Sequence, residues 1–164
     1  MDLDQKKGES IRRVGLKLEF SYWLLAIAFT LFTFIISLNP ILVKANIFLS
    51  LQLSLSIPLY FSSIFARAKI DSRPGKLILW EGFGFFTFIL AYGLTINVVG
   101  ILLAKLVSTN VGLCFWIVNI LAALAYSVLT IYSKEASFVS RFRKDLLFIG
   151  IIVLLGILPA LGIY

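Results

Sequence analysis

The sequence predicts an all-α membrane protein with about five transmembrane helices, and three observations support this fold class. Of the 164 residues, 60% are hydrophobic and only 14% are charged. The charged residues are gathered between long apolar runs, each about as long as the ~20 residues that a helix needs to cross a bilayer core. Basic residues are concentrated in alternate connections between these runs, as in the cytoplasmic loops of membrane proteins.

Taken in order, the apolar runs divide residues 1–164 into one bundle of spans, preceded by a cytoplasmic amphipathic segment at residues 1–19. The first span ends at Asn39-Pro40, a strong stop signal for a helix. The last span is the shortest and contains Pro159. The five predicted spans cover residues 20–43, 45–66, 78–104, 108–132 and 146–164.

The basic residues also predict an orientation. Thirteen of the fifteen Lys and Arg residues precede the first span, or lie between the second and third spans or the fourth and fifth. Only Lys44 and Lys105 fall in the other connections. Because cytoplasmic loops carry the excess of positive charge, the N-terminus is predicted to be cytoplasmic and the C-terminus outside. We therefore expect a multi-pass protein of the cell's inner (plasma) membrane, and we assign its net charge of +7 to topology rather than to nucleic-acid binding.

Two basic segments are predicted to lie along the inner leaflet. Before the first span, Ile11, Val14 and Leu18 share one helical face. Before the fifth span, Phe138 and Phe142 alternate with basic residues. Anionic lipid head groups are the expected partners of these surfaces, with a cytoplasmic protein as a second partner. The basic residues expected to make these contacts are Arg12, Arg13, Lys17, Arg141, Arg143 and Lys144.

Polar and small residues within the spans are candidates for helix packing or for a pore. Asn97 and Asn119 lie at similar distances from a break near Ser108, roughly 15–17 Å along each helix, and are expected to hydrogen-bond to each other. Gly93 and Gly100 flank Asn97 on one stripe, which allows a close helix approach. The full set of candidates is Gln52, Glu81, Gly93, Asn97, Gly100 and Asn119.

The fourth span contains two further residues with predicted roles. Trp116 is expected at the outer membrane boundary and Tyr132 at the inner one, as members of aromatic belts. Cys114, the single cysteine, is expected to be a small buried hydrophobe, and one cysteine excludes an internal disulfide.

No catalytic constellation is visible in the sequence. Histidine is absent, and Glu81 is the only acidic residue that borders a span without lying in a charged segment. A nucleophile with its base, paired carboxylates, a metal cluster and a cofactor site are therefore not expected, and the protein is predicted not to be an enzyme.

Two functional classes follow. The first is a non-catalytic oligomeric membrane subunit that anchors or signals to a cytoplasmic partner through its basic inner face, as in multi-component systems such as phage defence. The second is an oligomeric ion channel or small transporter, with a polar path along the second to fourth helices. Small-residue stripes on several helices favour a homo-oligomer in either class.

Overall fold

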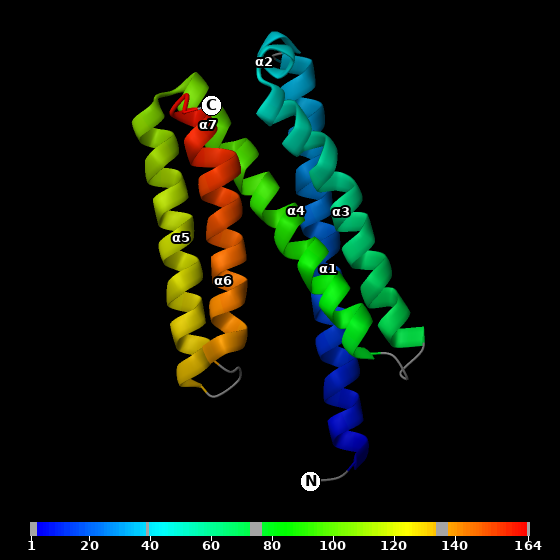
Figure 1. Ribbon diagram of the computed structural model, residues 1–164. Helices are drawn as coiled ribbons and strands as arrows, with labels where there is room; N and C mark the ends of the chain where they lie inside the picture. Colours follow the sequence, from blue (N-terminus) through cyan, green and yellow to red (C-terminus); the bar gives the residue numbers. More distant parts are fainter. Residues whose placement is uncertain (1–2, 39, 73–76, 134–137, 164) are drawn as a thin grey trace. The chain divides into compact units, whose positions relative to one another are not determined.

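The computed structural model describes residues 3–38, 40–72, 77–133 and 138–163, and nearly all of this described chain is helical. The predicted all-α fold is therefore confirmed. In chain order the elements are α1 (Leu3–Leu38), α2 (Pro40–Ala45), α3 (Ile47–Ser72), α4 (Leu77–Leu106), α5 (Thr109–Tyr132), α6 (Phe138–Ile152), the π-helix η2 (Val153–Ile157) and α7 (Leu158–Ala160) (Figure 1).

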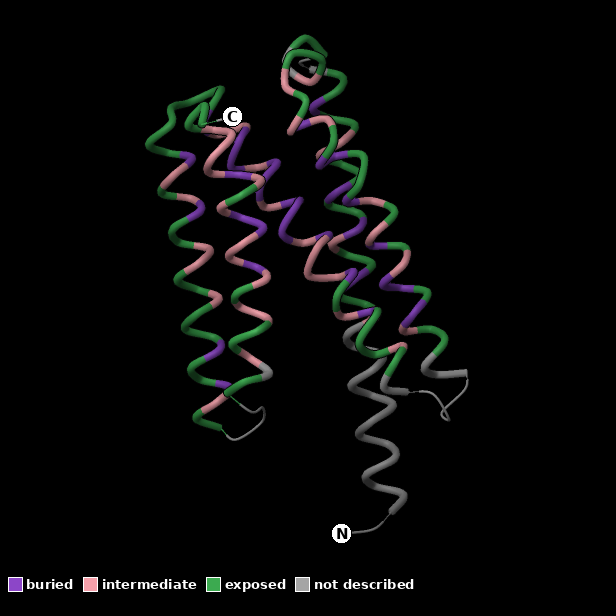
Figure 2. Tube along the Cα trace, in the orientation of Figure 1, coloured by how far each residue is buried: buried purple, intermediate pink, exposed green. Residues whose placement is uncertain are grey.

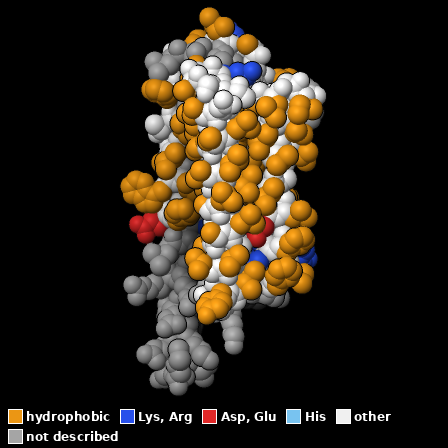
Figure 3. Space-filling model, turned by 90° about the vertical axis from the view of Figure 1, so that its left-hand side faces the viewer, with side chains coloured by type: hydrophobic (Ala, Val, Ile, Leu, Met, Phe, Trp, Pro, Cys, Tyr) orange, Lys and Arg blue, Asp and Glu red, His pale blue; other side chains and the backbone are white. Residues whose placement is uncertain are grey.

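Four helices in the described chain are long and apolar enough to cross a membrane. Hydrophobic side chains are spread over the described part of the face shown in Figure 3, as expected for a surface that contacts lipid tails. The protein is therefore a multi-pass membrane protein. The four apolar segments are Leu18–Ser37 of α1, Ile47–Lys69 of α3, Leu79–Leu106 of α4 and Thr109–Tyr132 of α5.

The predicted amphipathic segment at residues 1–19 and the first predicted span belong to the same helix. α1 has 36 residues and passes residue 19 without a break. It ends at Leu38, and Pro40 begins α2, where its fixed φ suits the first helical position. Asn39, the first residue of the predicted stop, lies outside the described residues.

By its contacts the chain forms two compact units, and both α3 and α4 contribute to each of them. The first unit comprises residues 1–45 and 53–92. The second comprises residues 46–52 and 93–164.

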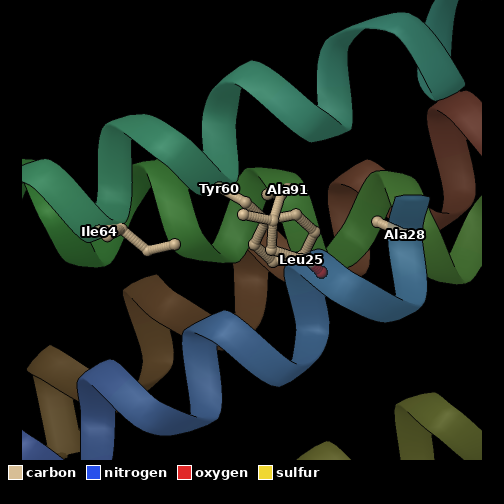
Figure 4. Packing of buried hydrophobic residues seen from close by; sticks show 5 residues of the cluster. All are labelled: Leu25, Ala28, Tyr60, Ile64 and Ala91. Atoms are coloured by element: carbon tan, nitrogen blue, oxygen red, sulfur yellow. The ribbon is translucent and has the colours of Figure 1, made fainter. Parts of the chain in front are cut away.

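The first unit has a small core where α1, α3 and α4 meet. Leu25 and Ala28 of α1 pack with Tyr60 and Ile64 of α3 and with Ala91 of α4 (Figure 4). The alanines let the helices approach closely while Tyr60, which is fully buried, fills the space between them. Packing of small residues against a large one is what holds apolar helices together in lipid.

The second unit is built around the end of α4 and the pair α5 and α6, which lie side by side (Figure 1). The break between α4 and α5 falls at the predicted place. Ser108 caps α5, with its Oγ accepting a hydrogen bond from the backbone N–H of Val111 at 3.3 Å. Most of the outer side of α5 is exposed (Figure 2), as expected for a helix whose large apolar side chains face lipid.

Candidate functional site

Asn97 is the polar centre of the second unit. Its side chain is fully buried on α4. Its Nδ2 donates a hydrogen bond to the carbonyl of Ile151 on α6 at 3.0 Å, and its Oδ1 accepts one from the indole Nε1 of Trp116 on α5 at 3.2 Å. One amide thus connects three helices. In an apolar environment both its donor and its acceptor need such partners.

Glycines make room for this hydrogen-bonded group. A Cβ placed on Gly100 would lie 2.5 Å from Cζ2 of Trp116, inside the indole ring's contact distance. A Cβ on Gly156 would overlap Oδ1 of Asn97 and lie 3.0 Å from the indole nitrogen. A Cβ on Gly93 would lie 2.9 Å from Cγ2 of Ile151. The predicted stripe of Gly93, Asn97 and Gly100 is therefore a helix-packing surface in this unit.

A second amide, that of Gln52, reaches the same end of the second unit. Its side chain is buried at 1% exposure, and Nε2 donates a hydrogen bond to the carbonyl of Leu155 at 2.8 Å. In an α-helix, the Leu155 carbonyl would accept a hydrogen bond from the backbone N–H of the residue four positions later. That residue is Pro159, which has no N–H. Leu155 also lies in the π-helix η2, where backbone hydrogen bonds join residues five positions apart. There the Leu158 N–H donates to the carbonyl of Val153. Gln52 therefore supplies a donor that the helix itself lacks.

If Gln52 supplies the hydrogen bond that Pro159 cannot, the cost of replacing Gln52 should depend on Pro159. We expect Gln52→Leu to destabilise the protein by about 1 kcal/mol, because the Leu155 carbonyl loses its donor in an apolar site. In a Pro159→Ala background the new backbone N–H replaces that donor, so the cost of Gln52→Leu should fall to about half or less. Unfolding of the unchanged protein and of the three variants in mixed micelles measures both costs. Equal costs in the two backgrounds would show that Gln52 does not compensate for the proline.

The expected hydrogen bond between Asn97 and Asn119 is not formed. Both polar ends of Asn97 are used by Ile151 and Trp116. Asn119 is half-buried, and its Nδ2 donates to the carbonyl of Phe115 one turn earlier on its own helix, at 2.8 Å. A side-chain bond to the preceding turn is the usual local solution for a polar residue in a lipid-facing helix. Glu81 is exposed on α4.

Two further expectations about α5 are wrong. Trp116 is fully buried and bonded to Asn97, so it is a core residue rather than an outer aromatic anchor. Cys114 is exposed rather than buried. Both errors come from the rotation of α5 about its axis, which turns Gly112 and Trp116 toward α4 and turns Cys114 away. Tyr132 is exposed at the end of the helix.

The beginning of α6 contains a charged cluster that faces α5. The guanidinium of Arg141 lies 4.8 Å from the ring centre of Tyr126, and its Nη2 donates to Oγ1 of Thr130 at 3.3 Å. One turn further along α6, Oδ1 of Asp145 accepts a hydrogen bond from the buried Ser127 at 2.7 Å. Arg141 is half-buried in this arrangement, so it takes part in joining α5 to α6.

The neighbouring side of this first part of α6 is exposed. Phe138 and Phe142 stack at 6.1 Å between ring centres, and they are 66% and 55% exposed. Arg143 is also exposed, whereas Lys144 is half-buried and has an interaction of its own. We call Phe138, Phe142 and Arg143 the basic-aromatic surface. The side chains of Arg12, Arg13 and Lys17 lie outside the described part of the structure, although their backbone belongs to α1.

The first unit contains a polar cluster that the sequence did not reveal. Oγ of Ser63 donates to the carbonyl of Gly84 at 2.7 Å, which fixes α3 against α4. Nη1 of Arg67 donates to the buried Ser21 of α1 at 2.6 Å, and its guanidinium lies 4.8 Å from the ring centre of Phe88. Arg67 was assigned only to the topological charge signal. Arg67 directly follows the predicted span 45–66. That position could have indicated that its side chain contacts other helices.

The described residues bring together no group of three or more His, Cys, Asp or Glu side chains. Comparisons of the chain with known protein families, curated proteins and solved structures found no match. The candidate site must therefore be judged from its own geometry. That geometry includes buried amides that connect helices, and an exposed surface at the beginning of α6 that contains aromatic and basic side chains.

Proposed function

We propose that this protein is a non-catalytic, oligomeric membrane subunit that recruits an acidic cytoplasmic protein through the basic-aromatic surface at the beginning of α6. The observation that carries the proposal is the exposed, stacked pair Phe138 and Phe142, together with the exposed Arg143 of the same helical turn as Phe142. Aromatic residues and arginine dominate the binding energy of protein interfaces. A compact subunit of this kind suits a multi-component system, such as a phage-defence pair.

The proposal includes five membrane crossings with a cytoplasmic N-terminus. The fifth crossing would consist of α6 from about Leu146 onward, η2 and α7, and two findings support it. These segments follow one another as a nearly unbroken helical run alongside α5. Two of their backbone carbonyls also accept hydrogen bonds from other helices: Ile151 from Asn97 of α4, and Leu155 from Gln52 of α3. Thirteen of the fifteen basic residues then lie on the cytoplasmic side, together with the basic-aromatic surface.

The alternative is an oligomeric channel or small transporter lined by Gln52, Asn97 and Asn119. The environment of these residues favours the anchoring function over this alternative. Gln52 and Asn97 are almost fully buried and donate to carbonyls within the second unit, and Asn119 bonds to its own helix. A residue that lines an aqueous path would instead direct its polar atoms toward water.

The basic-aromatic surface can be tested without disturbing the contacts of Arg141. We expect the pair Phe142→Ser and Arg143→Glu to lower partner capture at least about tenfold, since each removes an exposed interface side chain worth roughly 1–2 kcal/mol. Capture is measured by crosslinking in native membranes, followed by affinity purification and quantitative mass spectrometry.

The matched control is Val128→Ser, which removes an apolar side chain of similar exposure from the lipid-facing side of α5. Its set of captured proteins should equal that of the unchanged protein. Labelling of the termini confirms that the charge reversal has not altered the topology. If the double variant captures the same acidic proteins in the same amounts, the recruiting surface is not the beginning of α6.

A further inference from the structure

The first unit has a groove between the end of α3 and the beginning of α4, far along the chain from α6. Its volume is about 520 Å³. Phe65 and Phe83 form its walls and are 69% and 49% exposed. Trp80 packs edge-on against Phe83, with 6.4 Å between ring centres and an interplanar angle of 85°. The other main lining residues are Ala66, Ala68 and Lys69.

The groove exists because small residues hold the two helices close together at its base. A Cβ on Gly84 would lie 3.0 Å from Cβ of Ala66, so the backbones nearly touch there. The hydrogen bond from Ser63 to the carbonyl of Gly84 fixes the same contact. The large side chains of Phe65 and Phe83 extend beyond this contact and leave a depression between them. The depression is therefore a fixed feature of the packing of α3 against α4.

The chemistry of the groove differs along its length. Its walls are aromatic and aliphatic, whereas Lys69, near the end of α3, is a basic lining residue that also has an interaction of its own. The neighbouring Arg67 does not line the groove, because its guanidinium is bonded to Ser21 and lies over Phe88. Trp80 lies near the beginning of α4, and tryptophan is enriched in membrane proteins at the boundary between hydrocarbon and head groups. Glu81 follows Trp80 in the chain but is not among the groove's lining residues.

We propose that this groove binds one anionic phospholipid of the inner leaflet, with its phosphate at Lys69 and an acyl chain between Phe65 and Phe83. Basic pockets between transmembrane helices on the cytoplasmic side are recognised by anionic head groups. Lys69 is the basic residue among the described residues that line the groove. The volume is that of a small-molecule site, and an apolar groove within a membrane span is surrounded by acyl chains.

Native mass spectrometry of the purified full-length protein tests the proposal. The probes are phosphatidylglycerol and phosphatidylcholine with identical acyl chains, added singly in detergent. We expect retained phosphatidylglycerol to exceed phosphatidylcholine, and Lys69→Gln to lower its affinity by roughly fivefold, the effect of one basic residue near the head group. Ala68→Trp, which fills the groove from an exposed position, should abolish retention of that lipid.

Two matched variants control for nonspecific effects. Lys105→Gln removes an exposed lysine at the other end of α4, and Ala122→Trp adds an indole to the exposed side of α5. Both should retain phosphatidylglycerol like the unchanged protein. If Ala68→Trp does not fold, Phe65→Ala removes one exposed wall and should weaken retention instead. Equal retention of the two lipids, or retention unaffected by Lys69→Gln, would overturn the proposal.

Discussion

Gly100→Ala is expected to destabilise the protein by about 3 kcal/mol, the upper part of the usual range for forcing an extra methyl group into a packed core. The added Cβ would occupy the space now filled by the indole of Trp116. The indole is fully buried, so it has no free space into which to move without breaking its hydrogen bond to Asn97. The same methyl group would normally favour a helix, because alanine is a better helix former than glycine by about 1 kcal/mol. Steric exclusion therefore outweighs propensity at this position.

Thermal unfolding in detergent, followed by size-exclusion chromatography, measures this loss. Gly150→Ala is the matched control, since a Cβ there would meet nothing within 4 Å. Its melting temperature should equal that of the unchanged protein or exceed it slightly. If Gly100→Ala and Gly150→Ala behave alike, the close approach of Trp116 to α4 does not occur.

Asn97→Leu is expected to cost about 2 kcal/mol, the second largest effect of a single substitution. The change leaves the Ile151 carbonyl and the Trp116 indole N–H without partners in a buried apolar site. Leucine also fits poorly beside Gly156, which lies against the amide. Equilibrium unfolding in sodium dodecyl sulfate mixed micelles gives the free energy.

Asn119→Leu provides the comparison. Asn119 bonds only to the carbonyl of Phe115 on its own helix in the described structure, so we expect its replacement to change stability by less than about 0.5 kcal/mol. Ion flux into proteoliposomes should be the same for both variants and for the unchanged protein. Flux that falls when Asn97 and Asn119 are both replaced would instead support a polar path.

The sequence predicted where the long helices lie because hydropathy and length are properties of a single segment. The break at Ser108, the stop before Pro40 and the apolar segments of α1, α3, α4 and α5 follow from local residues. The continuity of α1 through residue 19 did not follow from them. A charged amphipathic segment and an apolar span can form one helix when no helix-breaking residue lies between them. Hydropathy averaged over a window of residues does not detect this continuity.

Helix partners were harder to predict, because a helix that is apolar on all sides has no preferred face in the sequence. Asn97 was matched with Asn119 by depth, although the indole of Trp116 and a carbonyl of α6 were equally within reach. The stripe of Gly93, Asn97 and Gly100 was predicted to serve helix packing or a pore, because small residues flanking an amide allow a close helix approach. The donor role of Gln52 depends on a π-helix and a proline about a hundred residues away, which no local pattern connects.

The central claim is that Asn97 joins helices within the second unit rather than lining a path, and a double-mutant cycle between Asn97→Leu and Trp116→Phe tests it most directly. The phenylalanine keeps an aromatic ring but removes the N–H that donates to Asn97. We predict a coupling free energy of about 0.6–1.7 kcal/mol between the two changes, from the average to the largest value measured for hydrogen bonds between membrane helices. Strictly additive costs would show that the two side chains do not interact, and would contradict the packing of α4 against α5.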